Sequence, residues 1–319
     1  MSDPLQSFRV AILAALGHAP EVIEPGRLQR FSTSGRASDK AGWCQLFEDG
    51  RAGVFGDFRQ GVSETWTLAG QSTLTREQRA TLARQVAAAT VERLAQQAQR
   101  WAENAKRNAE TWAQCAALTP TDPVALYLKR RGFGGVWPLP ECLRLHRALP
   151  YWHGRDKLGT FPAMVAPVVA PDGRMVALHR TYLAGDGRKA DVPEVKKLSG
   201  AAESLSGACI PLFKPARGVI GIAEGIETAL AARCASTLPT VAGYSASNLA
   251  AWQWPAGVQR VAIFADHDRA GREAADTLRA RALTAGLRAA VLTPTTEGAD
   301  WADVWAARDT GLTETGGAA

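Results

Sequence analysis

The stretches VIGIAEGIETAL, residues 219–230, and RVAIFADHDRAGREAA, residues 260–275, decide the fold of this chain. In each stretch an apolar run of strand length leads into a helical pattern, with acidic residues at the turn between them. Glu224 ends the first run, and Asp266 and Asp268 end the second. Because the carboxyl ends of parallel strands meet at one edge of a sheet, we expect these three carboxylates to lie close together.

The sequence around these stretches continues to alternate between strand and helix patterns. We predict further strands at residues 240–241 and 289–292, and helices from Glu227 and over residues 272–285. Such alternation is typical of a compact α/β unit with a mostly parallel sheet. We assign this unit to residues 217–309 and treat residues 310–319 as a tail.

Three neighbouring carboxylates favour a metal site over a packed core. They repel one another strongly unless a cation neutralises them. A hard divalent ion, Mg²⁺ or Mn²⁺, suits oxygen ligands together with substrate phosphate. We therefore predict that Glu224, Asp266 and Asp268 are catalytic metal ligands. Gly225 and Gly271 would let the turns beside them approach a ligand closely.

A second acidic pair, Asp300 and Asp303, follows the last predicted strand. If this loop returns to the same edge, the pair could hold a second metal ion, as in two-metal phosphoryl transfer. The alternative is an N-cap and a first-turn acid of a helix over residues 301–308. Glu227 lies one helical turn after Glu224 and could support the ligands or be exposed.

The first 118 residues carry weaker patterns. Residues 1–70 read as short strands and turns, which predicts a small β-rich region. Trp43 or Trp66 in this region could stack on unpaired bases, although core positions are the alternative. Residues 71–118 predict one long helix rich in Ala and Arg, which begins at a capping box formed by Thr75 and Gln78.

Residues 119–216 predict a basic, mixed α+β domain. A short helix over residues 123–131 precedes two apolar strands, at residues 163–169 and 175–183. The tripeptide Pro171-Asp172-Gly173 is a turn signal between these strands.

Composition limits the class of protein. The 319-residue chain holds enough apolar sequence for two or three domains, and no apolar run approaches the length of a membrane span. Its five cysteines form no CxxC pair, so we predict neither a zinc site nor a disulfide framework, and we expect a cytoplasmic location. The cysteines are Cys44, Cys115, Cys142, Cys209 and Cys234.

Charge is distributed unevenly. Residues 1–216 carry 28 Lys and Arg against 20 Asp and Glu, whereas residues 217–319 carry 9 against 11. A basic body beside an acidic module fits a polyanionic substrate. A basic surface that serves only solubility is the alternative.

The acidic stretches resemble the Toprim domain of bacterial primases, topoisomerases and some nucleases. The segments EGIETAL and FADHDRAGREAA carry this resemblance. Upstream, YLKRRGF, PAMVAPV, LHRTYL, KKLSG and GACIPL are similar to the segment that precedes Toprim in primases of phages, plasmids and integrative elements. GWCQLFEDG and FGDFR also resemble the N-terminal regions of these primases. The resemblance implies that Glu224, Asp266 and Asp268 bind the metal, and that Asp300 is the later acidic position.

Polymerisation also requires cations for the triphosphate and the template. Arg180, Lys196 and Lys197 lie in segments that match the primase pattern, and together they could clamp phosphates across the cleft from the metal. Arg269 and Arg272 flank the second acidic turn and could also contact nucleotide or DNA. Ordinary surface charge is the alternative for all five.

The resemblance implies a DNA-directed RNA polymerase, a primase that makes short RNA primers on single-stranded DNA from ribonucleoside triphosphates for a bacterial mobile element. The sequence lacks the paired cysteines of a primase zinc module and the GxxxxGK[ST] motif of a helicase motor, so a separate helicase is an expected partner. Two alternatives remain: a Toprim nuclease that activates water at the same acids, and a non-catalytic accessory protein that binds single-stranded DNA.

Overall fold

The computed structural model describes the chain except for residues 1–2, 36–38, 59, 71–73, 137 and 312–319. The chain forms two compact units, Met1–Arg100 and Trp101–Ala319, and the boundary between them falls within one long helix, α2 (Arg76–Ala113). No helix among the described residues is both long enough and apolar enough to span a membrane.

The first unit is built on a four-stranded antiparallel sheet. Its strands lie in chain order: β1 (Gln29–Phe31), β2 (Gly42–Leu46), β3 (Ala52–Asp57) and β4 (Val62–Thr67). The N-terminal part of α2 covers one face of this sheet, where Ala89 packs with Trp43 and Val54.

The helix α1 (Pro4–Leu16) packs on the first unit's core as well, and the prediction of only strands and turns before residue 71 was wrong there. Asp3 caps this helix by accepting a hydrogen bond from the amide of Leu5, and Pro4 occupies its first turn. Phe8, Ile12 and Leu16 follow one another at helical spacing and are buried. The spacing of these apolar residues therefore indicates a helix in the segment that precedes the first strand.

The structure also corrects the proposed role of Trp43. This side chain is 2% exposed, so it belongs to the core and cannot stack on a base. Trp66 is half-buried and packs on Phe8 with ring centroids 5.2 Å apart.

The long helix α2 begins as the capping box predicts. Thr75 N donates to Gln78 Oε1 at 2.8 Å, and Gln78 N donates to Thr75 Oγ1 at 3.2 Å. The helix ends at Ala113, earlier than the predicted residue 118, because the chain enters the short strand β5 (Ala116–Ala117) and pairs with the next strand.

After β5, the second unit continues with the helix α3 (Pro123–Leu128), which runs directly into a π-helical turn, so helical structure covers the predicted residues 123–131. The five residues Lys129–Phe133 form a wider turn, in which Gly132 has a φ of 87°. This left-handed conformation favours glycine and interrupts the regular helix.

An antiparallel sheet forms the body of this part. Its strands lie in chain order: β5, β6 (Arg144–His153), β7 (Asp156–Val169), β8 (Met175–Tyr182) and β9 (Lys196–Leu198).

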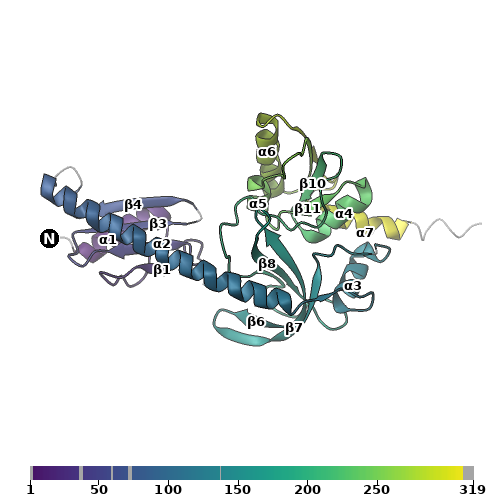
Figure 1. Cartoon of the computed structure of the whole chain (residues 1–319), viewed down its shortest axis with the longest axis horizontal. Helices are drawn as coiled ribbons and strands as arrows, with labels where there is room; N and C mark the ends of the chain where they lie inside the picture. The colour runs from purple at the N-terminus through teal and green to yellow at the C-terminus, as the bar shows by residue number, and fades with distance from the viewer. Residues whose placement is uncertain (1–2, 36–38, 59, 71–73, 137, 312–319) are drawn as a thin grey trace, which may run out of the picture. The chain divides into compact units, whose positions relative to one another are not determined.

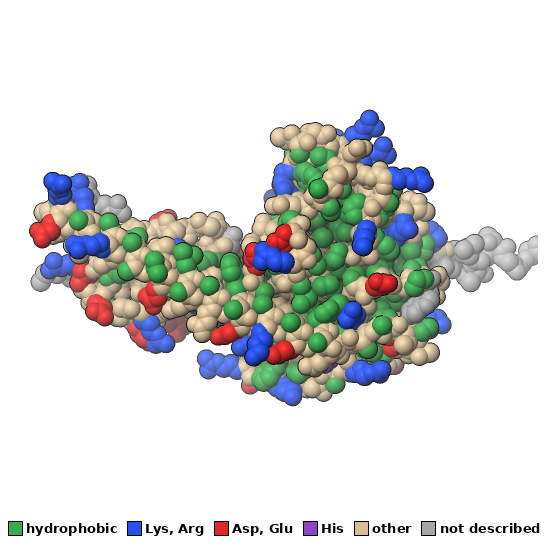
Figure 2. Space-filling model, viewed as in Figure 1, with side chains coloured by type: hydrophobic (Ala, Val, Ile, Leu, Met, Phe, Trp, Pro, Cys, Tyr) green, Lys and Arg blue, Asp and Glu red, His purple; other side chains and the backbone are tan. Residues whose placement is uncertain are grey.

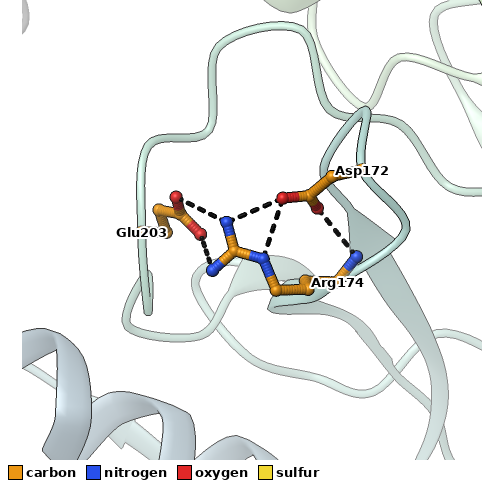
Figure 3. Close-up of polar contacts among 3 residues, drawn as sticks. All are labelled: Asp172, Arg174 and Glu203. Atoms are coloured by element: carbon orange, nitrogen blue, oxygen red, sulfur yellow. Dashed lines mark hydrogen bonds and ion pairs between the residues drawn. The ribbon is translucent and has the colours of Figure 1, made fainter.

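The predicted turn joins β7 to β8, and Figure 3 shows how Arg174 stabilises it. The Arg174 guanidinium lies 2.7 Å from a carboxylate oxygen of Asp172 and 2.7 Å from one of Glu203. The Arg174 amide also donates to Asp172 at 3.0 Å. One arginine thus connects the hairpin to the loop that carries Glu203.

A four-stranded parallel sheet follows, in the order β11 (Thr240–Ala242), β10 (Val219–Ala223), β12 (Arg260–Phe264), β13 (Arg288–Leu292). Its four helices are α4 (Ile226–Ser236), α5 (Ala246–Ala251), α6 (Arg269–Thr284) and α7 (Trp301–Gly311) (Figure 1). The predicted fold class, a parallel α/β unit after an α+β region, is confirmed.

Alternating residues of the central strands build a core on each face of this sheet. Ile222 and Ile263 pack in the core that includes Ala275 and Leu278 of α6. Ala223 and Phe264 point to the other face and pack with α4. That second core continues into the antiparallel sheet, so the two sheets of this unit share buried side chains.

Candidate metal centre

The three acids with predicted catalytic roles lie at one edge of the parallel sheet. Glu224 follows β10 directly, and Asp266 lies two residues beyond the end of β12. These strands are parallel neighbours, with Ala223 opposite Phe264. The fold therefore places the two acidic turns side by side, as the sequence predicted.

Asp266 is the most unusual carboxylate in this group. Its Oδ1 atom is buried and has no hydrogen-bond partner among the described residues. Burial, together with the charges of Glu224, Asp300, Asp268 and Asp303, raises the pKa of Asp266 to about 7. A buried carboxylate without a cation beside it is held at a cost in free energy.

Glu224 is affected in the same way. Burial raises its pKa, and so does the charge of Asp268. The backbone amide of Ala246 and the charge of Lys196 oppose this shift. Both turns therefore favour a bound cation or proton.

Asp268 has a structural role besides any ligand role. Its side chain accepts a hydrogen bond from Gly271 N at 2.7 Å and caps α6. The predicted start of this helix at Arg272 was therefore three residues too late. Gly271 lies inside the first turn, where an added Cβ would lie 2.7 Å from the backbone oxygen of Asp266, so glycine permits close packing of the helix on the loop.

Backbone hydrogen bonds bring the second acidic loop to this edge. His267 N donates to Ala299 O at 3.0 Å, and Gly298 N donates to His267 O at 2.8 Å. Asp300 follows directly, and its charge reaches Asp266.

Asp300 and Asp303 form a reciprocal cap of α7. Asp303 N donates to Asp300 Oδ1 at 2.8 Å, and Asp300 N donates to Asp303 Oδ2 at 3.3 Å. The capping alternative is thus present in the structure. It engages one oxygen of each carboxylate and leaves the other oxygens available for a ligand.

The carboxylates at this edge of the parallel sheet have the donor chemistry that a divalent cation requires. No group of three His, Cys, Asp or Glu side chains in the described part of the chain already has metal-ligand geometry. Mutual repulsion at Asp266 and its unpartnered buried oxygen are properties expected of oxygen ligands of a divalent cation. Mg²⁺ or Mn²⁺ suits such a donor set.

Glu227 is a buried carboxylate. The sequence alone left open whether this residue supports the metal ligands or is exposed. It is 3% exposed and accepts hydrogen bonds from Tyr127 Oη at 2.6 Å and from Lys196 Nζ at 2.9 Å. Burial would raise its pKa, but Lys196 and Tyr127 dominate and lower it to about 2. Burial lowers the pKa of the neighbouring His179 to about 4, so this imidazole is neutral at pH 7.

One signal in the sequence pointed to this site. Helix α4 reads IETALAARCAS, and its residues from Ile226 to Ala232 are all buried. A helix that is apolar on all sides is a buried helix, and a glutamate within it needs a partner. That partner comes from strand β9, which is distant in sequence.

The three cations predicted to clamp phosphates do not share one face. Strand pairing places Lys197 opposite Arg180 and Lys196 opposite Thr181. Since side chains alternate along a strand, Lys196 lies on the face opposite to Arg180 and Lys197. The prediction that all three act together as one clamp was wrong for this reason.

Each of these cations also has a partner in the chain. Lys196 pairs with Glu227, and Arg180 Nη2 donates to Leu198 O at 2.7 Å. Lys197 Nζ donates to Trp152 O at 2.6 Å and lies 4.4 Å from the ring centroid of Tyr151. Lys196 remains close enough to the acidic edge to lower the pKa of Glu224.

Arg269 and Arg272 lie in the first turn of α6, beside the acidic edge, and both are exposed. Arg269 pairs with Glu273 at 2.8 Å on the helix surface. On the face drawn in Figure 2, Lys and Arg side chains are spread over both units, with no single patch.

Two family models match the second unit. Residues 219–310 match the Toprim domain family. Residues 102–209 match a domain of unknown function (DUF7146). No curated protein matches this chain.

Several solved structures overlap partly with this fold. A DNA primase domain from Pseudomonas aeruginosa is 18% identical, covers 52% of this chain and 54% of its own, and has a TM-score of 0.35. The zinc-binding and RNA polymerase domains of the Aquifex aeolicus primase are 14% identical over 99% of this chain and 86% of their own, with a TM-score of 0.39. The primase fragment of the bacteriophage T7 primase-helicase protein is 16% identical over 62% and 72%, with a TM-score of 0.36.

The match to the Pseudomonas structure thus spans about half of that domain. The family match, rather than these partial overlaps, identifies the domain. Residues 219–310 form a Toprim domain, and its acidic edge carries the candidate metal centre.

Proposed function

We propose that this protein is a primase, a nucleotidyltransferase that makes short RNA primers on single-stranded DNA. The observation that carries the proposal is the buried, unpartnered Asp266 oxygen at the acidic edge of a Toprim domain. A site of this kind is suited to metal-dependent chemistry on phosphates.

The proposed reaction joins two ribonucleotides. The 3′-hydroxyl oxygen of one attacks the α-phosphorus of a second ribonucleoside triphosphate, the hydroxyl proton is lost, and pyrophosphate leaves with the electrons of the broken P–O bond. Glu224, Asp266 and Asp268 would hold Mg²⁺ or Mn²⁺, and Asp300 and Asp303 would complete a second position. The bound ion would stabilise negative charge on the attacking and leaving oxygens.

The cations divide into two roles in this proposal. Lys196, held by Glu227 beside Glu224, would contact a phosphate next to the metal. Arg180 and Lys197, on the other face of the sheet, and Arg269 and Arg272, at the start of α6, would contact nucleotide or template phosphates. A separate helicase, a mobile-element host and a bacterial cytoplasmic location belong to the same proposal.

A nuclease would use the same acids to activate water. The basic segment favours a primase, because its strands β8 and β9 carry the cations and contribute to the same unit as the Toprim sheet. Both enzymes need cations to bind the DNA backbone, but only a polymerase needs further cations for a triphosphate.

Purified protein, single-stranded DNA, labelled ribonucleoside triphosphates and Mg²⁺ or Mn²⁺ test the proposal directly. Short labelled oligomers are expected from the wild type and are lost in Asp266→Asn. Asp276→Asn, which changes an exposed acid of the following helix α6, is the matched control and retains the product. Template degradation would replace the primase by a nuclease, and DNA binding without either product would indicate an accessory protein.

A further inference from the structure

Three arginines of the first unit lie close together and form no ion pair within the described part of the chain. Arg30 belongs to β1, and Arg93 and Arg100 belong to α2. Arg93 and Arg100 are seven residues apart, so they share one face of the helix. Burial, together with the charges of Arg100 and Arg93, lowers the pKa of Arg30 to about 10, so the three guanidinium groups are close enough to repel.

Two aromatic rings contact two of these cations, Arg30 and Arg93. The Arg30 guanidinium carbon lies 4.1 Å from the ring centroid of Phe58. That of Arg93 lies 4.3 Å from Trp43 and 5.7 Å from Phe58. The Phe58 and Trp43 centroids are 6.0 Å apart. Cation–π contacts of this kind orient a guanidinium without neutralising its charge.

The polar contacts of Arg30 are also with neutral groups. Arg30 Nη2 donates to Gln97 Oε1 at 2.8 Å, and Nη1 donates to Lys40 O at 3.4 Å. The Nε atom is buried without a partner within the described residues. Among the ion pairs of those residues, none involves Arg30, Arg93 or Arg100. No described carboxylate thus lies within ion-pair distance of these three guanidinium groups.

The spacing of the arginines indicates the kind of anion that they would bind. Seven residues of helix separate Arg93 from Arg100 by about 10 Å along the axis, which is wider than a single phosphate group can bridge. Phe58 stands beside the cations and is 37% exposed, although it is a large apolar side chain. Phosphates in series next to an exposed aromatic ring are the features of single-stranded nucleic acid recognition.

We infer that Arg30, Arg93, Arg100 and Phe58 form a binding site for single-stranded nucleic acid, in which the arginines contact successive phosphates and a base stacks on Phe58. This site lies within the first unit and does not depend on the metal centre. It would remain valid if the second unit had another activity.

The test uses the full-length protein and a fluorescein-labelled oligothymidylate, without divalent cations, with anisotropy as the readout over a range of salt concentrations. The variant Arg30→Gln/Arg93→Gln/Arg100→Gln is compared with Arg76→Gln/Arg79→Gln/Arg84→Gln, which removes the same charge from exposed positions of α2. We expect the first variant to lose at least about 10-fold in affinity and about 2 units of salt slope. The control should lose about 3-fold or less.

Two single variants keep the test valid if the triple variant unfolds. Arg100 is exposed, so Arg100→Gln leaves the fold intact and should weaken binding by about 3-fold. Phe58→Ala should weaken binding of the single strand by about 5-fold or more, and binding of a duplex much less. Equal losses in the two triple variants, or no effect of Arg100→Gln and Phe58→Ala, would overturn the inference.

Discussion

Two carboxylates of the second unit, the buried Glu227 and the half-buried Asp266, differ in what surrounds them. Glu227 accepts hydrogen bonds from Tyr127 and Lys196, and its pKa falls to about 2. Asp266 has a buried oxygen without a partner, and its pKa rises to about 7. Burial alone raises both pKa values, so the partner decides the outcome.

The comparison separates a structural acid from an acid that needs an external cation. At Glu227 the chain supplies the positive charge, through a strand of the neighbouring sheet. At Asp266 the chain supplies only more carboxylates. The second arrangement is stable only when a proton or a metal ion balances the charge.

The largest expected effect is the loss of primer synthesis when a carboxylate of the acidic edge is replaced. Asp266→Asn should reduce primer synthesis by about 1000-fold, because the amide cannot hold the cation that stabilises charge on the reacting oxygens. A primer-synthesis assay measures this loss, with Asp276→Asn as the control. Retention of wild-type activity in Asp266→Asn would remove this carboxylate from the site.

The next largest effect is the loss of stability when Glu227, the paired acid, is replaced. Glu227→Gln should lower the free energy of unfolding by about 2–3 kcal/mol, because a buried charge pair loses one partner. Lys196 is partly exposed and can turn to solvent, which places the loss below the upper range for buried pairs. Urea unfolding measures the loss, and Tyr127→Phe, which removes one hydrogen bond, should cost about 1 kcal/mol.

The variant Glu227→Gln should also change how the stability of the protein depends on pH. The folded pKa of Glu227 is lowered from 4.5 to about 2, so the unfolded chain takes up the proton first. The stability from Glu227 is complete above pH 4.5 and is lost as the pH falls toward about 2. Glu227→Gln should lack this part of the acid destabilisation, and identical pH profiles would contradict the ion pair.

A smaller effect is the stabilisation that Mg²⁺ should give by binding at Asp266. The raised pKa means that stability contributed by this group is complete below 3.8 and is lost as the pH rises through about 7. Mg²⁺ at saturating concentration should restore about 2 kcal/mol, and more above pH 7 than below it, because protons compete for the same oxygens. Thermal unfolding with and without Mg²⁺ measures this, and Asp268→Asn, which keeps the helix cap, should reduce the gain.

The smallest effect concerns the exposed cations beside the acidic edge. Arg269→Gln and Arg272→Gln should raise the KM for ribonucleoside triphosphates by about 3-fold each without changing stability, because their charges lie in solvent. Steady-state kinetics measure this change. A loss of stability instead would mean that these side chains support α6.

Sequence reasoning identified the strands and turns of the Toprim domain because each depends on a local pattern. Val219–Ala223 carries a strand signal that ends at an acid, and the structure has the same bounds. Parallel pairing then requires Glu224 and Asp266 to share an edge. The helix α1 was missed although Phe8, Ile12 and Leu16 show its period, because strand signals further along the region dominated the interpretation.

Local sequence was sufficient for the α/β class, the position of the acidic edge and the capping boxes, since these follow from periodicity and from contacts within a few residues. Tertiary structure alone decided that Glu227 is paired, that Lys196 and Lys197 face opposite ways, and that Arg30 meets Arg93 and Arg100. Each of these results joins residues that are distant in sequence or depends on strand register. A shift of one residue in register reverses the face of every side chain, and the pairing of the strands in the folded sheet decides which register holds.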